Sequence, residues 1–352
     1  MACDVASAAM KRTLTAAVLI AALLGPAAAS AASRHPKPPH DSSTTLAVIG
    51  DIPYGDALIA EFRQDIQEIN ADADVSRVIH LGDIKNGSTR CDTSYFLDRL
   101  NDFQTVADPL VYTPGDNEWT DCHRANNGAY NPVERLGVIR DLFFSHPGRT
   151  LGSERARVAF QSRAYPENVL WRQRGVVYGT VHVVGSNDDH AVWFTDRKDA
   201  AGNPLPETRK ETGQRAREYT HREAANLDWL DTIFDVAERT RAPGLVIGMQ
   251  ADMWDPTAEQ SAFEAVKAVI AERSEEFGEP VLLMQGDSHL LKVDRPAGMP
   301  DNLTRIVVQG STNVPHEWTK LTVDPADPGV FSCEQVEFVT KKLSPCPGAL
   351  AP

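Results

Sequence analysis

The sequence predicts an α/β fold built on a largely parallel sheet, with a second sheet later in the chain. Between residues 46 and 144, apolar runs typical of buried strands alternate with patterns of amphipathic helices, which indicates βαβ units. Four apolar runs along the chain end in the dipeptide Gly-Asp, at Asp51, Asp83, Asp116 and Asp287. Residues 169–184 contain two successive runs rich in β-branched residues around a glycine, and these predict strands of the second sheet.

Each element is predicted from its local pattern. Leu58, Phe62, Ile66 and Ile69 recur at spacings of three and four, which is typical of an amphipathic helix. Further helices are expected at 95–106, 133–144, 218–242 and 257–276, and strands from 46 to the Asp51 turn and at 78–81, 110–112, 169–174, 176–184, 245–249 and 281–284, with short strands through 338. Residues 186–215 combine glycine, prolines and many charges, which predicts a long exposed loop.

The chain is expected to hold one large domain at 46–340, after a signal peptide and a linker. Lys11 and Arg12 precede an apolar run and small residues that offer cleavage sites, so residues 1–31 are interpreted as a secretory signal peptide. That run is too short to span a bilayer. Residues 32–45 are Pro-rich and polar, which predicts a disordered linker, and 341–352 are expected to be a C-terminal tail. We therefore expect a secreted protein, extracellular or periplasmic, without membrane contact after cleavage.

The charge of the chain excludes one class of partner. The formal net charge is −14, and cleavage of residues 1–31 would remove Lys11, Arg12 and Asp4, one net positive charge, to leave −15. Nucleic-acid binding is dominated by Lys and Arg side chains that neutralise phosphates. The acidic balance therefore argues against nucleic acid as a partner. It leaves the oligomeric state open.

Four cysteines follow the predicted signal peptide: Cys91, Cys122, Cys333 and Cys346. An even set in an oxidising compartment predicts two disulfides, with three possible pairings, and four free thiols are the alternative. We expect Cys91–Cys122 and Cys333–Cys346, because the first two cysteines follow the Asp83 and Asp116 turns, which should be neighbours. The first bond would clamp these two turns together.

The four Gly-Asp turns predict a cation site. In open α/β sheets the carboxyl ends of the strands border one crevice, so carboxylates that follow different strands can meet there. Two carboxylates about 4 Å apart repel by roughly 4 kcal/mol at an effective dielectric near 20. A bound divalent metal reverses this repulsion and keeps the acids ionised. The alternative is that Gly-Asp is simply a common turn dipeptide, and four occurrences after apolar runs favour the metal.

The motifs IGD, LGDIKNG, TPGDNEW, GMQADMW and QGDSH, in this order, resemble those of the calcineurin-like metallophosphoesterases. The resemblance covers Leu46 to about Val323. It implies a four-layer sandwich of two mixed β-sheets flanked by helices, with two metal ions bridged by the second-motif Asp. On this resemblance Asp83 is the bridging ligand, Asp51 is the first-motif carboxylate, and His289 is the second histidine of the fifth motif.

Several positions depart from the family pattern. Pro53 stands where the family has the first-motif His, Asp116 where it has Asn, Asn117 where it has the proton-donating His, and Asp287 where it has a His, while Gln250 replaces the lone fourth-motif His. Asp116, Gln250 and Asp287 still offer oxygen atoms. Such an oxygen-rich shell favours Mg, Mn or Ca, with Fe or Zn as the other candidates.

Further residues of these loops are candidates for chemistry. Tyr54, three residues after Asp51, is a candidate phenolate ligand, or alternatively a packed aromatic. Since the amide of Asn117 cannot supply a proton to the leaving group, His123 and Glu118 are the candidate acids; the alternative for His123 is a plain loop residue.

Three cations on the same loops, Lys85, Arg90 and Arg124, are candidates for binding a phosphate, and ordinary solvated charge is the alternative for each. The sequence thus predicts an exported metal-dependent hydrolase of small-molecule phosphoesters. The rival hypothesis is a non-catalytic descendant that keeps the fold and binds a ligand or a partner. The number of replaced histidines favours the rival, whereas the retained oxygen ligands favour the enzyme.

Overall fold

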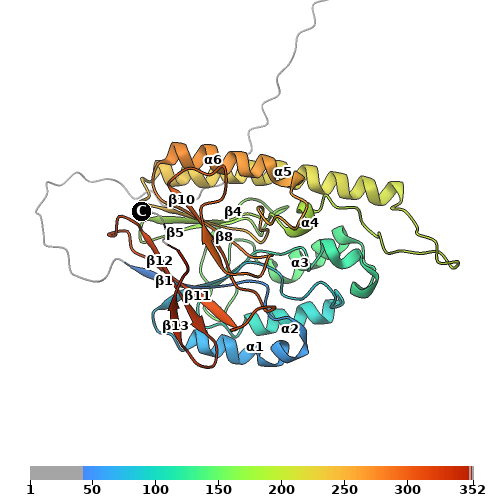
Figure 1. Cartoon of the computed structure of the whole chain (residues 1–352), viewed down its shortest axis with the longest axis horizontal. Coiled ribbons are helices and arrows are strands. Elements are labelled where there is room, and N and C mark those ends of the chain that lie inside the picture. The colour runs from blue at the N-terminus through green and yellow to red at the C-terminus, as the bar shows by residue number, and fades with distance from the viewer. Residues whose placement is uncertain (1–42, 349, 351–352) are drawn as a thin grey trace, which may run out of the picture. The chain divides into compact units, whose positions relative to one another are not determined.

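Two mixed β-sheets face each other, with helices on both outer sides (Figure 1). The computed structural model describes residues 43–348 and 350, so the predicted signal peptide and most of the predicted linker lie outside the described residues. The six-stranded sheet has the order β13-β12-β11-β1-β2-β3 and the seven-stranded sheet the order β4-β5-β6-β7-β8-β10-β9. The predicted four-layer fold class is confirmed.

The bounds of the elements follow the sequence pattern closely. The first sheet contains β1 Thr44–Ile49, β2 Val75–His80, β3 Leu110–Tyr112, β11 Glu317–Val323, β12 Phe331–Glu337 and β13 Leu343–Pro345. The second contains β4 Ala159–Phe160, β5 Val169–Gln173, β6 Val176–Thr180, β7 Leu245–Gly248, β8 Val281–Gln285, β9 Lys292–Asp294 and β10 Leu303–Val307. The helices are α1 Gly55–Asn70, α2 Thr93–Phe103, α3 Pro132–Phe143, α4 Gly185–Asp188, α5 Arg209–Arg239 and α6 Glu264–Phe277.

Each sheet is parallel at the strands that deliver the predicted ligands and antiparallel outside them. β1, β2 and β3 are parallel neighbours, and so are β6, β7, β8 and β10. Antiparallel strands β11 to β13 extend the first sheet beyond β1, and the antiparallel strand β9 forms one edge of the second sheet. The carboxyl ends of the parallel strands therefore all feed loops at one edge of their sheet.

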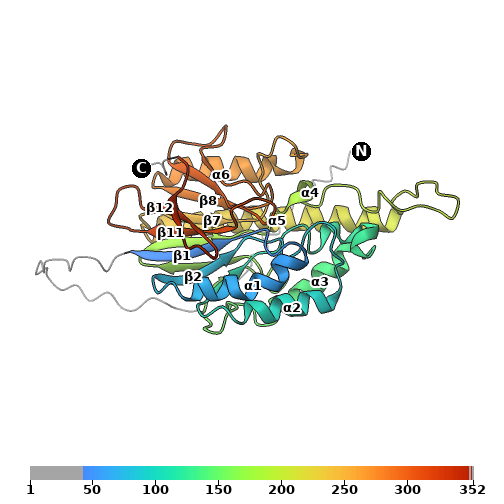
Figure 2. The ribbon, with the colours of Figure 1, turned by 60° about the horizontal axis from the view of Figure 1, so that its bottom comes forward.

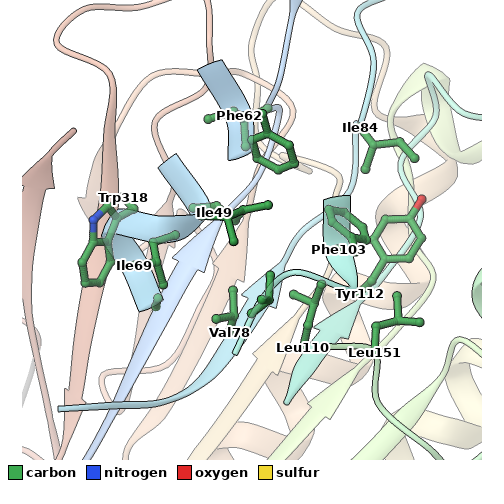
Figure 3. Close-up of a cluster of buried hydrophobic side chains, with 14 of the residues drawn as sticks. Ile49, Phe62, Ile69, Val78, Ile84, Phe103, Leu110, Tyr112, Leu151 and Trp318 are labelled. Atoms are coloured by element: carbon green, nitrogen blue, oxygen red, sulfur yellow. The ribbon is translucent and has the colours of Figure 1, made fainter. Parts of the chain in front are cut away.

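The alternation of side chains along the strands builds three apolar layers. On β1, Ala47 and Ile49 face α1 and α2, whereas Leu46 and Val48 face the other sheet. Figure 3 shows the first of these layers, where Phe62 of α1 lies near Ile49. Helices α5 and α6 cover the second sheet in the same way, as both views of the ribbon show (Figure 2). The central strands of both sheets are thus buried on both faces.

Three predicted boundaries differ from the structure. Helix α5 begins at Arg209, inside the predicted loop 186–215, because Thr208 and Glu211 form a capping box that starts the helix. Within the predicted C-terminal tail, Leu343–Pro345 form β13, which pairs with β12. The helix expected from 257 begins at Glu264, after a short 3₁₀ turn. Among the residues that the structure describes, no helix has the length and apolar character that crossing a membrane requires.

Candidate metal centre

Five of the predicted metal ligands lie together at the carboxyl ends of strands from both sheets. One ligand atom each of Asp51, Asp83 and His289 lie within 4.8 Å of one another, and the same holds for Asp83, Asp116 and Asp287. These side chains follow β1, β2, β3 and β8. Asp83 belongs to both groups, which is the position expected of a ligand shared between two ions.

The backbone of these turns is adapted to the carboxylates. Asp51, Asp83 and Asp287 have φ of 55°, 59° and 72°, a left-handed conformation that Asp tolerates better than most residues. Backbone strain of this kind concentrates at functional sites. Gly115 leaves room for one of the acids, because a Cβ there would lie 2.0 Å from Asp83 Oδ1. The same is true of Gly185, where a Cβ would lie 2.7 Å from Asp287 Oδ1.

The crowded carboxylates shift each other's ionisation. Burial, followed by the charges of Asp116 and other neighbouring acids, raises the pKa of Asp83 well above its ordinary value. Burial and the same neighbour, Asp116, also raise the pKa of Asp287 well above its ordinary value. In the described part of the chain no lysine or arginine forms an ion pair with either acid. These carboxylates could hold a divalent cation, which would replace protons as the charge that offsets their repulsion.

Asp83 is held in place by two neighbours. The hydroxyl of Tyr54 donates a 2.9 Å hydrogen bond to Asp83 Oδ2, and Asn117 donates to the same carboxylate from Nδ2 at 2.7 Å and from its backbone N at 3.2 Å. Burial and the charges of Asp83 and Asp51 raise the pKa of Tyr54 well above its ordinary value. In the structure the hydroxyl of Tyr54 thus contacts Asp83 as a hydrogen-bond donor, and its predicted role as a phenolate ligand stays a prediction. Asn117 orients Asp83.

Asp116 is held by Ser186 and Gln250. The Ser186 hydroxyl lies 2.8 Å from Asp116 Oδ2, and Gln250 Nε2 donates to Asp116 Oδ1 at 3.3 Å. Gln250 was predicted to offer a carbonyl oxygen, but that oxygen accepts a 2.6 Å hydrogen bond from the backbone N of Gly185. This bond fixes the amide with its N–H groups towards Asp116. In the structure Gln250 thus contacts Asp116 through its N–H groups, and its predicted role as a metal ligand stays a prediction.

His289 faces the first-motif carboxylate. Its Nε2 lies 3.4 Å from Asp51 Oδ1, and its Nδ1 lies 2.7 Å from the hydroxyl of Thr312. Burial lowers the pKa of His289, but the hydrogen bond and the charge of Asp51 outweigh it and raise the pKa above the ordinary value. The hydroxyl of Thr312 fixes the ring orientation, which is the usual role of a second partner on a metal-binding histidine.

The two predicted acids lie in different surroundings, Glu118 beside Asp83 of the cluster and His123 against Phe194. Glu118 is fully buried, and its Oε1 accepts hydrogen bonds from the backbone N of Ile84 and the hydroxyl of Tyr112, both at 3.0 Å. His123 Nδ1 accepts a 2.8 Å hydrogen bond from the backbone N of Phe194, and burial lowers the pKa of His123 to about 4. Glu118 thus holds the Ile84 and Tyr112 side of the loop, and burial raises the pKa of Glu118 above its ordinary value. The lowered pKa of His123 makes the neutral ring the main form near pH 7. The predicted proton-donor role of both residues stays a prediction.

Two of the three predicted phosphate-binding cations, Lys85 and Arg90, contact other groups. Lys85 is fully buried and its Nζ donates to the carbonyl oxygens of Asn86 and Asn117, at 2.9 and 2.8 Å. Burial lowers its pKa to about 8. Arg90 pairs with Asp92 on the surface. Lys85 and Arg90 therefore do not reach a phosphate in this structure.

Arg124 is the third cation, and it is better placed. Its Nη1 lies 2.6 Å from Asp121 Oδ2, and the side chain is 41% exposed. Asp121 Oδ1 in turn lies 2.8 Å from the hydroxyl of Ser186, which also contacts Asp116. Of the three cations, Arg124 is thus the one that the structure connects with the cluster.

The predicted disulfides both form, and one supports the centre. Cys91 pairs with Cys122, and Cys333 with Cys346. The sulfur atoms of Cys91 and Cys122 lie 3.6 and 3.7 Å from the carbonyl oxygen of Asn117, the residue that orients Asp83. The predicted clamp between the two loops is therefore present in the structure.

The sequence reasoning missed residues that support the ligands. Gly185 and Ser186 contact the acids, and Ser311 donates to the carbonyl oxygen of Asp51. The sequence does contain a pattern that marks two of these turns. Apolar runs also end in Gly-Ser at 185–186 and 310–311, which is the Gly-Asp pattern with a smaller polar residue. A search for Gly followed by any polar residue finds both turns.

The chain has distant likenesses among solved structures. No family model matches it, and no curated protein matches it. A dimetal phosphatase from Danio rerio is 13% identical, with 83% of this chain and 92% of that one covered and a TM-score of 0.47. GAP50, the anchor in the inner membrane complex of Plasmodium, is 9% identical, with 86% and 88% covered and a TM-score of 0.45. Neither likeness assigns an activity to this chain.

Proposed function

We propose that this protein is a metal-dependent phosphoester hydrolase, a divergent relative of the calcineurin-like metallophosphoesterases that acts on a small-molecule phosphoester. One observation carries the proposal: the two triads of neighbouring ligand atoms share the buried Asp83. A shared carboxylate between two neighbouring groups is the arrangement of two-metal sites that cleave phosphoesters.

The donor set fits divalent cations. Asp51, Asp83 and His289 would hold one ion, and Asp83, Asp116 and Asp287 the other. Four carboxylates and one imidazole form an oxygen-rich set, which suits Mg, Mn or Ca better than Zn. A mononuclear site built on either triad is the simpler form of the same proposal.

The residues around the ligands prepare the site. A bound divalent ion supplies a Lewis acid that lowers the pKa of water and polarises phosphoryl oxygens. Tyr54 and Asn117 direct the oxygens of Asp83, and Thr312 directs the ring of His289. Ligands held in this way lose little freedom when an ion or a substrate binds, which is the advantage of a preorganised site.

The test is an assay of purified chain 32–352 on an aryl phosphate with Mg, Mn, Ca, Fe or Zn, repeated with Asp83→Asn. We expect metal-dependent turnover that falls at least a hundredfold in Asp83→Asn, since Asp83 serves both triads. Asp228→Asn, which removes an exposed carboxylate from α5, is the matched control and keeps full activity. Turnover that survives both chelation and Asp83→Asn would overturn the proposal.

A non-catalytic binding function is the second candidate. It is favoured by the surroundings of one acid candidate, because the Nδ1 atom of His123 accepts a hydrogen bond from the backbone N of Phe194. The same experiment separates the two functions. Chain that binds metal in the wild type but not in Asp83→Asn, and that turns over no phosphoester with any metal, is the result expected of a binding protein.

Export is part of the proposal. Residues 1–31 have the pattern of a secretory signal, and two disulfides are compatible with an oxidising compartment. We expect the intact chain, expressed in a secreting host, to appear outside the cytoplasm with a new N-terminus near residue 32. N-terminal sequencing of the secreted protein checks this, and an uncleaved cytoplasmic product contradicts it.

A further inference from the structure

A buried network of charged side chains reaches the Asp287 side of the metal centre. Arg305 of β10 is 2% exposed, and its Nε and Nη2 each lie 2.8 Å from a carboxylate oxygen of Asp294 on the neighbouring strand β9. Its Nη1 lies 2.5 Å from Oδ1 of Asp252, a buried residue that follows β7. One arginine thus binds two acids from separate segments of the chain.

Asp252 connects this network with the metal centre. Its backbone N donates a 3.3 Å hydrogen bond to Asp287 Oδ2. Its side-chain Oδ2 accepts a 2.9 Å hydrogen bond from the hydroxyl of Ser288, the residue next to Asp287. Asp252 therefore contacts both residues of the turn that presents the Asp287 carboxylate.

The side chain of Asp252 is fixed by contacts within the fold. Its Oδ1 accepts from Arg305 and from the backbone N of Trp254, at 3.1 Å, and its Oδ2 accepts from Ser288. Lys292 is further away, with Nζ 3.9 Å from Oδ2. Both oxygens of Asp252 thus have partners before any ion binds, so the segment that contacts Asp287 is held in one orientation.

The energetics of the buried pair favour a role in positioning. Burial of Arg305 and Asp252 carries a large desolvation penalty, which their attraction offsets only where the geometry is good. A buried ion pair therefore adds little net stability compared with apolar side chains of the same volume. The pair does fix the relative position of two segments, because the forked guanidinium binds Asp252 and Asp294 at the same time.

We infer that Arg305 and Asp252 are positioning residues for the Asp287 carboxylate, and that they set the affinity for the ion that this carboxylate would hold. The inference rests on the proposed function, because it needs an ion at Asp287. The two residues act in sequence, since Arg305 fixes Asp252 and Asp252 contacts Asp287. The ion proposed at His289 has a different support, because Thr312 contacts that ring.

Titration with Mn²⁺ tests the inference. Asp287→Asn and His289→Gln each remove one proposed ligand, and these two variants identify which binding step belongs to which ion. In Arg305→Lys the charge stays, but the planar fork that binds Asp252 is lost. We expect the affinity for the ion at Asp287 to fall roughly 10- to 100-fold, as when partners of metal ligands are removed, and that for the ion at His289 to change less than about threefold.

Two further variants complete the experiment. Ser288→Ala removes one contact of Asp252 and leaves the buried ion pair in place, so it should weaken the same ion by a smaller factor. Arg273→Lys is the matched control and should leave both affinities unchanged. Arg273 lies on α6 and also binds several acids, namely Asp231, Asp235 and Glu238.

Equal losses for both ions in Arg305→Lys, or an unchanged affinity for the ion at Asp287, would overturn the inference. If Arg305→Lys does not fold, Ser288→Ala decides by the same measurements. If the wild type binds no Mn²⁺ at Asp287, the two-ion form of the proposed function fails, and hydrogen exchange of the Asp252 amide tests the positioning alone. Faster exchange of this amide in the variant supports the inference, and exchange equal to that of the wild type overturns it.

Discussion

The backbone N of Asp287 lies 3.1 and 3.0 Å from the two carboxylate oxygens of Asp51, although 236 residues separate them. Asp51 follows β1 of the first sheet and Asp287 follows β8 of the second. This contact ties the two sheets together at the metal centre. The proposed metal centre is therefore built from residues of both sheets. We expect substitutions where the two sheets meet to alter metal binding first.

Gly115→Ala is expected to weaken metal binding at least tenfold. The new Cβ would lie 2.0 Å from Asp83 Oδ1, and both this carboxylate and the backbone near it would have to move. Isothermal titration with Mn²⁺ measures the effect. Gly137→Ala is the control, since its Cβ has open space inside α3 and the change should stabilise the chain by about 0.5–1 kcal/mol. Unchanged Mn²⁺ affinity in Gly115→Ala would contradict the geometry.

The two disulfides should differ in their effect on metal binding. In the chain-entropy model, removal of Cys91–Cys122, which are 31 residues apart, costs about 3.7 kcal/mol, and removal of Cys333–Cys346, 13 apart, about 2.9 kcal/mol. Replacing the first pair by serine should also lower Mn²⁺ affinity, because Cys91 and Cys122 contact the Asn117 carbonyl. Urea unfolding and metal titration of both double variants test this. An equal loss of Mn²⁺ affinity in the two double variants would contradict a role of the Cys91–Cys122 bond in supporting the metal centre.

Glu167→Gln should destabilise the protein in a pH-dependent way. Burial would raise the pKa of Glu167, but Arg140 and His182 outweigh it and lower the pKa to about 2. Because the pKa of Glu167 is lower in the folded chain than in the unfolded chain, where it is about 4.3, the ionised carboxylate stabilises the fold above about pH 4.3. This stabilisation is lost as the pH falls towards 2.

The loss in Glu167→Gln is therefore about 3 kcal/mol at pH 7, from the difference of roughly 2.3 between the unfolded pKa of about 4.3 and the folded pKa of about 2, and it shrinks below about pH 4. Urea unfolding at several pH values measures it. Glu223→Gln, at a carboxylate near the surface of α5, is the control and should change stability little. A loss that is independent of pH would show that packing, and not the charge of Glu167, makes the contribution.

Added Mn²⁺ should raise the melting temperature more at about pH 7.5 than at about pH 5. Without metal, the raised pKa values of Asp83 and Asp287 mean that the folded state binds more protons than the unfolded state, so these acids cost stability as pH rises. The metal replaces those protons and binds best when both acids are ionised. Calorimetry with and without Mn²⁺ checks this. An equal shift at both pH values argues against metal binding at these acids.

Local patterns were sufficient to predict which strands end at the centre. Gly-Asp after an apolar run marks Asp51, Asp83, Asp116 and Asp287 because the turn needs a left-handed or unhindered backbone beside the carboxylate. The pairing of Cys91 with Cys122 was predicted because these cysteines follow two of the same turns, at Asp83 and Asp116. These inferences depend on residues close in sequence and on a general rule about parallel sheets.

Other roles depend on contacts that local patterns do not contain. Lys85 looks like a surface cation, but folding buries its ammonium against a carbonyl 32 residues away. His123 is neutral because Phe194, 71 residues later, donates to its ring. The start of α5 is different, since its capping box at Thr208 was visible in the sequence and the surrounding prolines and charges obscured it.

Anomalous X-ray diffraction from crystals grown with Mn²⁺ tests the metal centre most directly. The account predicts strong peaks within coordinating distance of Asp83, one shared with Asp51 and His289 and the other with Asp116 and Asp287. A single peak at either triad is the mononuclear form. No peak beside Asp83 under saturating Mn²⁺ would contradict the account.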